Sequence, residues 1–212
     1  MDTIKKLSDY AILTDSKIRF MGVPKTIDND LAATDHTPGY GSAAKYIASI
    51  TKEVIRDGLV YDQQNVTILE IMGRNAGWLT GAAALAKCED CEGPDMLFLP
   101  EIPFDVDVFM KKVEDLHKQK KSVVVAVSEG VKVADGRYVC ELTDSTDYVD
   151  AFGHRQLTGT ARYLSLKIAG EVGCKTRAIE FNTLQRCASH IVSRVDITEA
   201  YQVGGAAVKA AF

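Results

Sequence analysis

The sequence lacks any apolar stretch long enough to cross a membrane. No apolar run approaches the ~20 residues of a membrane-spanning helix, and the N-terminus lacks the apolar core of a signal peptide. Basic charge is not in excess either, since 25 Lys and Arg residues stand against 29 Asp and Glu residues. Such a chain presents no basic field to nucleic acid. We therefore expect a cytoplasmic protein that acts on neither membranes nor nucleic acids.

Cysteine is also scarce, with five residues among 212, which fits the reduced thiols of a cytoplasmic protein. Cys88 and Cys91 have the spacing of half a zinc site, but no second Cys or His pair with ligand spacing accompanies them. A structural metal is therefore the less favoured interpretation. His36, His117 and His190 are not paired with a nucleophile, so we interpret them as structural or solvated residues.

The apolar residues that are present alternate between short β-type runs and helical patterns. The expected strands cover residues 18–23, 65–71, 95–99, 122–128 and 176–181. Four helices are expected. The first begins at Thr37-Pro38, the second covers 77–87, the third runs from Val106 to Leu116, and the fourth lies near 160–171. This alternation predicts an α/β fold with a mostly parallel sheet covered on both faces.

One polar segment, residues 25–30, combines an ammonium, a hydroxyl and two carboxylates directly after the first expected strand. This combination suits phosphoryl transfer, since one carboxylate can accept a proton and the other can hold Mg²⁺ through water. Asp and Asn also cluster in loops for backbone reasons. Taken alone, the segment is equally consistent with a polar turn.

Three candidate groups follow three different expected strands. Asp28 follows strand 18–23, Arg74 follows strand 65–71, and Glu129 closes strand 122–128. Ligands of open α/β sheets bind at the carboxyl ends of strands, so these groups are expected to line one crevice. The alternative is that Arg74 caps a helix or pairs with Glu70, and that Glu129 is a surface turn residue.

Four segments in the same order resemble the 6-phosphofructokinase family across nearly the whole chain. They are KTIDND at 25–30, EIMGRNAGWLT at 70–80, VVVAVSEG at 123–130, and the pair formed by TR at 176–177 and LQR at 184–186. The resemblance implies a phosphofructokinase-like three-layer sandwich and the glycolytic phosphorylation of fructose 6-phosphate at its 1-hydroxyl. The lysine before TIDND looks more like the pyrophosphate-dependent branch, although some ATP-using relatives share it. Pyrophosphate is the expected donor and ATP the alternative.

The resemblance also implies roles for the first segment and for Arg74. Asp28 would be the general base and Lys25 would sit beside the donor phosphates. Thr26 would touch the transferred group or the sugar, and Asp30 would help to position Mg²⁺. Arg74 would stabilise the developing charge, for which a fixed guanidinium is well suited.

The remaining family positions concern the sugar phosphate. Met72 and Gly73 would hold the sugar through their backbone amides, and Glu129 would accept hydrogen bonds from its hydroxyls. Arg177 and Arg186 would bind the 6-phosphate, and the counterpart of Arg177 usually reaches in from a neighbouring subunit. A homo-oligomer is therefore implied.

The chain departs from the family pattern at two phosphate-binding positions. Asn182-Thr183 stands where many relatives have the histidine of a GHxQR pattern, and Asn65 replaces an arginine. Acceptors other than fructose 6-phosphate, such as sedoheptulose 7-phosphate, therefore stay open. The segment around His154 and Arg155 looks like GHxQR but has the wrong spacing to Arg177, so we interpret it as a loop.

The resemblance finally implies that the chain is incomplete, because complete relatives carry glycine-rich donor loops upstream and further elements downstream. We expect residues 1–38 to be the remnant of the donor domain with the catalytic loop. Residues 39–184 would then bind the sugar phosphate, and residues 185–212 would return to the donor domain. A non-catalytic sugar-phosphate-binding fragment is the alternative function. Uncovered apolar faces should make the chain associate.

Overall fold

The computed structural model describes residues 1–142 and 157–212, and its centre is a parallel sheet of four strands. The strand order is β2-β3-β1-β4, with every neighbouring pair parallel. The bounds are β1 Asn65–Ile71, β2 Met96–Phe98, β3 Ser122–Ser128 and β4 Lys175–Glu180. β1 and β3 match the predicted ranges, β2 is shorter, and β4 is shifted by one residue. Both central strands are buried along their whole length, which explains why they are rich in Val, Ile and Leu on both faces.

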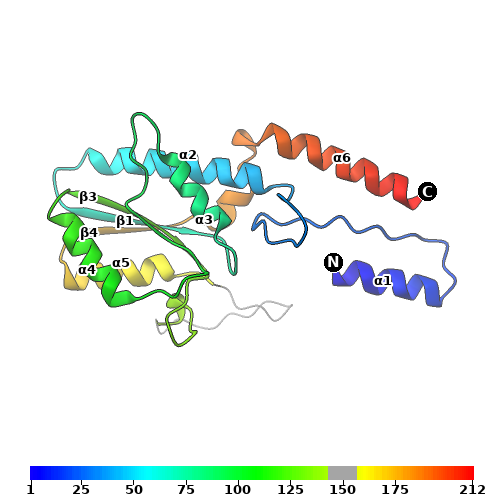
Figure 1. Cartoon of the computed structure of the whole chain (residues 1–212), viewed down its shortest axis with the longest axis horizontal. Helices are drawn as coiled ribbons and strands as arrows, with labels where there is room; N and C mark the ends of the chain where they lie inside the picture. Colours follow the sequence, from blue (N-terminus) through cyan, green and yellow to red (C-terminus); the bar gives the residue numbers. More distant parts are fainter. Residues whose placement is uncertain (143–156) are drawn as a thin grey trace.

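Helices cover both faces of the sheet, which confirms the three-layer α/β prediction (Figure 1). α2 (Tyr40–Leu59), α3 (Trp78–Ala82) and the 3-10 helix η1 (Ala83–Ala86) pack on one face. α4 (Val106–His117) and α5 (Thr160–Glu171) pack on the other. Leu69 and Ile71 of β1 join the first core, while Val66 and Ile68 join the second. The side chains of β1 therefore alternate between two separate cores.

The expected strand at 18–23 is wrong. This segment follows α1 (Asp2–Leu13), and no strand of the described residues pairs with it. Its β-type composition reflects local propensity, which becomes a strand only where a neighbouring strand supplies a ladder. α1 and the C-terminal helix α6 (Arg194–Ala211) both extend away from the sheet on the same side (Figure 1).

The predicted helix start at Thr37-Pro38 is also wrong, because α2 begins at Tyr40. The Thr37 hydroxyl does not cap the helix but donates to the carbonyl of Thr26 at 2.6 Å. Gly39 takes a left-handed conformation with φ of +100°, which redirects the chain before the helix starts. A helix terminus that looks complete in sequence is thus displaced by a tertiary contact.

The cap of α2 comes from α6 instead. The Asp196 carboxylate, only 6% exposed, accepts hydrogen bonds from the backbone N–H groups of Gly39 and Ser42 and from the Ser42 hydroxyl. A carboxylate at a helix N-terminus satisfies unpaired N–H groups and is favoured by the helix dipole. This contact anchors the start of α6 on α2. None of the helices in the described part of the chain is both long and apolar enough to cross a membrane.

Candidate functional site

The loop after β1 turns sharply against the end of β3. Gly73 has a φ of +146°, and a Cβ atom there would lie 2.5 Å from the carbonyl oxygen of Ala76. The Ser128 hydroxyl at the end of β3 donates to the Gly73 carbonyl. Only glycine fits this conformation and this space, so backbone sterics require the glycine of the Gly73-Arg74 pair.

The end of β3 approaches the same loop even more closely. A Cβ atom on Gly130 would lie 2.0 Å from the carbonyl oxygen of Arg74. The carboxylate of Glu129 accepts a long hydrogen bond, 3.4 Å, from the backbone N–H of Gly73. The loop after β1 and the end of β3 therefore lie in direct contact.

The segment 25–30 closes onto this surface as an ordered loop. Ile27 is buried in the core beneath α2, which anchors the loop. The backbone N–H of Asp28 donates to the Thr26 hydroxyl oxygen at 3.1 Å, and the Thr37 N–H donates to the Asn29 side-chain oxygen at 2.9 Å. The segment is a bend whose backbone at Asp28 is fixed by the Thr26 hydroxyl.

Asp28 and Glu129 both carry raised pKa values. Burial is the main cause for Asp28, and repulsion by Asp30 adds to it, while Arg74 and Lys25 act in the opposite direction. Burial, followed by repulsion from Asp28, raises the pKa of Glu129 to about 7 against the lowering effects of the Gly73 hydrogen bond and two arginines.

These mutual effects define one cluster, formed by Asp28, Arg74, Glu129 and Arg186, which we call the carboxylate–arginine cluster. It draws its members from the segment 25–30 and from the carboxyl ends of β1, β3 and β4. Half-buried carboxylates among guanidinium groups can accept protons from hydroxyls and bind phosphate at the same place.

Sequence reasoning missed the residue that connects this cluster internally. Gln185, in the 3-10 helix η3 (Asn182–Arg186), is only 2% exposed. Its side-chain oxygen accepts from the Met72 N–H at 3.2 Å, and its nitrogen donates to the Asn182 carbonyl at 3.0 Å. The LQR motif contained the residue, but no local pattern shows that the glutamine rather than the arginine faces inward.

Arg177 lies apart from the carboxylate–arginine cluster. Its guanidinium stacks over the ring of Tyr61, 4.8 Å from the centroid, and Lys175 lies over the same ring at 5.0 Å. The Nη1 atom of Arg177 is buried without a hydrogen-bond partner among the described residues. Tyr61 precedes β1, so this second basic group belongs to the opposite end of the sheet from the cluster.

The structure also gives the partners of Glu70 and Asn65, two residues that the sequence analysis named. The Glu70 carboxylate accepts hydrogen bonds from the N–H groups of Gly159 and Ala161 at the start of α5, which accounts for its buried position. Asn65 is fully buried, and its side chain bonds to the carbonyl of Gln63 and accepts from the Ser122 hydroxyl. Asn65 therefore has a structural role where relatives are expected to carry an arginine.

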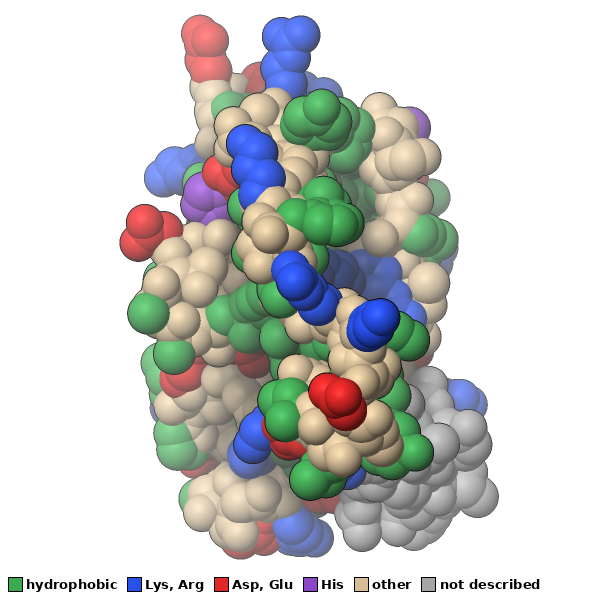
Figure 2. All heavy atoms as spheres, turned by 90° about the vertical axis from the view of Figure 1, so that its right-hand side faces the viewer, with side chains coloured by type: hydrophobic (Ala, Val, Ile, Leu, Met, Phe, Trp, Pro, Cys, Tyr) green, Lys and Arg blue, Asp and Glu red, His purple; other side chains and the backbone are tan. Residues whose placement is uncertain are grey.

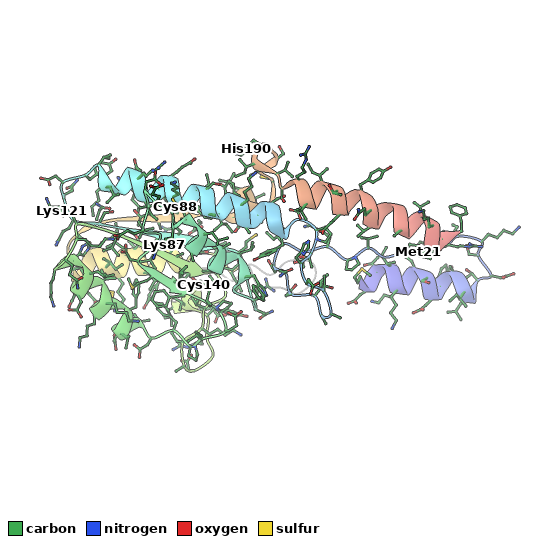
Figure 3. All side chains as sticks on the ribbon, turned by 45° about the horizontal axis from the view of Figure 1, so that its top comes forward. Met21, Lys87, Cys88, Lys121, Cys140 and His190 are labelled. Carbon is green, nitrogen blue, oxygen red and sulfur yellow. The ribbon has the colours of Figure 1, made fainter. Side chains whose placement is uncertain are left out.

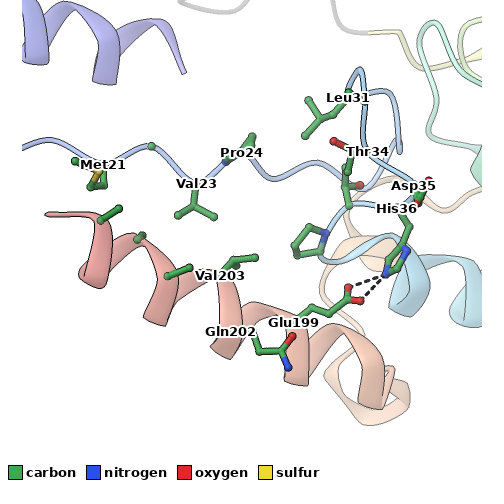
Figure 4. A pocket seen from close by; sticks show the side chains of 17 residues that line it. Met21, Val23, Pro24, Leu31, Thr34, Asp35, His36, Glu199, Gln202 and Val203 are labelled. Carbon is green, nitrogen blue, oxygen red and sulfur yellow. Dashed lines mark hydrogen bonds and ion pairs between the residues drawn. The ribbon is translucent and has the colours of Figure 1, made fainter.

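A groove of about 740 Å³ lies beside the segment 25–30, between residues 21–24, the loop 31–38 and α6 (Figure 4). Apolar side chains dominate it, including Val23 and Val203, and the pair of His36 and Glu199 closes one end at 2.7 Å. This contact fits the structural interpretation of His36. His190 is exposed, in the 3-10 helix η4 (Ser189–Ile191).

Few of the described side chains could contribute to a metal site. Within residues 1–142 and 157–212, no three His, Cys, Asp or Glu side chains lie close enough together to hold a metal ion by themselves. Asp30 is exposed beside Asp28. His154 and Arg155 lie outside the described residues.

Comparison with known proteins identifies the family. The phosphofructokinase family model matches residues 1–211. The pyrophosphate–fructose 6-phosphate 1-phosphotransferase of Xanthomonas campestris pv. campestris is 41% identical over 98% of this chain and 50% of its own length. The sulfofructose kinase of Alkalicoccus urumqiensis is 33% identical over 91% of this chain and 48% of its own length.

Structural similarity points the same way. The crystal structure of pyrophosphate-dependent phosphofructokinase from Marinobacter aquaeolei superposes with a TM-score of 0.79 and 36% identity, over 98% of this chain and 48% of that one. The chain thus spans about half the length of the relatives it matches. From its motifs, its fold and the match over residues 1–211, the chain belongs to the phosphofructokinase family.

Proposed function

We propose that the chain supplies the catalytic base and the sugar-phosphate site of a pyrophosphate-dependent phosphofructokinase. The reaction transfers a phosphoryl group to the 1-hydroxyl of fructose 6-phosphate. The observation that carries the proposal is the carboxylate–arginine cluster, because it unites four distant segments at one end of the sheet. The names of relatives with 41% and 38% identity support the same activity.

Asp28 is the general base of this proposal. Burial and Asp30 raise its pKa, so it accepts a proton more readily than an exposed aspartate does. As the sugar oxygen bonds to phosphorus, Asp28 takes the hydroxyl proton and inorganic phosphate leaves the pyrophosphate. Lys25 and Arg74 stabilise the charge on the phosphates, and Thr26 contacts the transferred group.

The sugar phosphate binds along the strand ends. Met72 and Gly73 line the sugar site, and Glu129 bonds to the sugar hydroxyls. The Met72 and Gly73 N–H groups donate to Gln185 and Glu129 in this structure, so each would have to exchange that partner to hold the sugar directly. Arg186 binds the 6-phosphate of the same molecule. Arg177, which stacks on Tyr61 away from the cluster, serves the site of a second copy of the chain, so the working form is a homo-oligomer.

The donor set fits Mg²⁺. This ion is commonly bound by one or two carboxylates, with waters and phosphate oxygens as its other ligands. Asp30 is exposed and lies close enough to Asp28 to raise its pKa, so Asp30 would hold the ion at the edge of the cluster. Bound Mg²⁺ would neutralise charge on the donor phosphates. In this arrangement residues 1–38 and 185–212 belong to the donor domain, from which Arg186 reaches the 6-phosphate, and residues 39–184 form the sugar-phosphate domain.

A coupled assay for fructose 1,6-bisphosphate tests the proposal. The chain is assayed with Mg²⁺ and either pyrophosphate or ATP, beside the Asp28→Asn variant. We expect turnover with pyrophosphate and at least a 100-fold loss in the variant, the order of magnitude of a general base. Turnover with ATP alone would reassign the donor.

Calorimetric binding of fructose 6-phosphate separates catalysis from recognition. Arg186→Leu should weaken binding, and Arg137→Leu should not, because Arg137 lies on an exposed turn paired with Asp135. Binding without turnover would support the non-catalytic sugar-phosphate-binding alternative. The absence of both binding and turnover would refute both functions.

A further inference from the structure

Cys88 and Cys91 face each other across a two-residue turn. The Cys88 N–H donates to the Cys91 carbonyl at 2.8 Å, and the Cys91 N–H donates to the Cys88 carbonyl at 3.2 Å. Residues that exchange both bonds have Cα atoms about 5.5 Å apart and side chains on the same face. Disulfides span Cα separations of about 4.4–6.8 Å. The backbone therefore holds the two Cα atoms at a separation that a disulfide can span.

The turn is held in place by contacts that do not involve the thiols. Gly93, with φ of +83°, brings the chain back against Lys87, and a Cβ atom on it would lie 3.3 Å from the Lys87 Cβ. Asp90 at the tip pairs with Lys52 of α2 at 2.8 Å and with Arg56. Figure 3 shows Lys87 and Cys88 beside α2, far from Met21 at the other end of the molecule.

The two thiols differ in access, as a redox pair requires. Cys88 is exposed, and its thiol donates to the Asp90 carboxylate at 3.1 Å. Hydrogen bonds to Asp90 and, secondly, to Cys88 raise the pKa of Lys52, which places its ammonium beside the Cys88 sulfur. Cys91 is only 7% exposed and packs in the core beneath α2. An oxidant from solvent therefore meets Cys88 first, with Cys91 next to it as the second thiol.

We propose that Cys88 and Cys91 form a reversible thiol–disulfide pair that low-molecular-weight disulfides oxidise. The Cys88 thiolate attacks one sulfur of the external disulfide, forms a mixed disulfide and releases one thiolate. The Cys91 thiolate then attacks the Cys88 sulfur and releases the second. The protein loses two electrons and two protons, and the oxidant becomes two thiols. The zinc interpretation lacks further ligands, since the described residues place no group of three metal-binding side chains together.

The bond should be easily reduced. Directly opposite residues have Cβ atoms about 4.5–5.5 Å apart, whereas disulfides prefer about 3.8 Å, so closing the bond strains the turn. Strained and exposed disulfides have more oxidising potentials than structural ones and are the labile or regulatory kind. The pair is thus expected to be a switch rather than a permanent crosslink.

Oxidation by glutathione disulfide, followed by alkylation of free thiols, trypsin digestion and mass spectrometry, tests the proposal. Residues 88–111 form one tryptic peptide that contains Cys88, Cys91 and no other cysteine. We expect this peptide to lose the mass of two hydrogens, to escape alkylation, and to regain both thiols with dithiothreitol. Cys187 is exposed and serves as an internal control that should acquire only a glutathione adduct.

Substitution of Cys91, the second thiol, distinguishes disulfide formation from the addition of glutathione to Cys88 alone. In Cys91→Ser the Cys88 adduct should persist, because nothing displaces the glutathione. The proposal is overturned if the wild-type peptide keeps a stable adduct on Cys88. It is equally overturned if both thiols stay alkylatable while Cys187 is modified, or if non-reducing electrophoresis shows that the disulfide joins two chains.

Discussion

Gln185 accepts a hydrogen bond from the backbone N–H of Met72 across 3.2 Å and so joins the segment after β4 to the loop after β1. The side-chain nitrogen of Gln185 donates to the carbonyl of Asn182. These two segments carry Arg186 and Arg74, so one buried glutamine links the backbone supports of the two arginines of the carboxylate–arginine cluster.

Gln185→Ala should lower the free energy of unfolding by about 1–3 kcal/mol, because it leaves the Met72 N–H without its partner. It should also weaken fructose 6-phosphate binding, although Gln185 itself touches no ligand in the proposal. Urea unfolding and calorimetry measure the two effects. Gln119→Ala changes an exposed glutamine just after α4 and is the matched control. Equal stability of the two variants would contradict the assigned contact.

Gly130→Ala should be severely destabilising, by more than about 3 kcal/mol, because its Cβ atom would lie 2.0 Å from the Arg74 carbonyl oxygen. Gly81→Ala provides the comparison. Gly81 lies in α3 with nothing within 4 Å of the added atom, so the substitution should stabilise the chain by about 0.5–1 kcal/mol. Thermal unfolding of both variants checks the prediction, and similar melting temperatures would show that the two strand ends can separate at low cost.

The central strands could be predicted from the sequence because both faces of β1 and β3 are buried, which makes each a short segment rich in Val, Ile, Leu or Ala without polar alternation. The segment 18–23 has similar local propensity, yet no strand of the described residues pairs with it. Propensity measures how well a residue fits a sheet and carries no information on whether a neighbouring strand exists.

The carboxylate–arginine cluster could be predicted in part for the same reason. Strand ends in a parallel sheet share one edge, so Arg74 and Glu129 converge once the order of elements is known. Asp28 follows no strand of the described residues, and the burial of Ile27 beneath α2 anchors its segment instead. The contacts of Gln185 and Asp196 join segments more than a hundred residues apart in sequence. Such pairings are set by tertiary packing and leave no local pattern.

Stability should decrease as the pH rises from about 4.5 through 7. Burial raises the pKa of Glu70 and of Glu129 to about 7 from their ordinary 4.5. Between these values the folded chain keeps protons that the unfolded chain has released, so each carboxyl disfavours folding by up to about 3 kcal/mol above pH 7. Urea titrations at several pH values measure the slope.

Glu129→Gln isolates one of these two carboxyls. The amide oxygen can still accept from the Gly73 N–H, but it does not titrate. The decrease in stability across this pH range should therefore shrink by about half. An unchanged slope would assign the pH dependence to groups other than Glu129.

The docking of α6 should depend on Asp196. Asp196→Ala removes the acceptor for the Gly39 and Ser42 N–H groups, which should free the start of α6 and lower the free energy of unfolding by about 1–3 kcal/mol. Asp196→Asn keeps one acceptor oxygen and should be intermediate. Amide hydrogen exchange of residues 194–211 measures the effect, and unchanged protection in Asp196→Ala would show that other contacts hold the helix.

The chain should associate through the apolar faces of α1 and α6. Ile12 and Leu13 of α1 are 77% and 84% exposed, and Tyr201 of α6 is 85% exposed. Figure 2 shows hydrophobic side chains on this end of the molecule, interspersed with lysine and arginine. Exposed apolar surface of this kind is removed from water most simply by contact with another chain.

Light scattering should find species larger than a monomer, and Ile12→Lys with Leu13→Lys should reduce them. Leu59→Lys, at an exposed position at the end of α2, should not. A monodisperse monomer at every concentration would show that these faces are stable in water, while equal loss of the larger species in both variants would mean that added positive charge, not the α1 face, controls association.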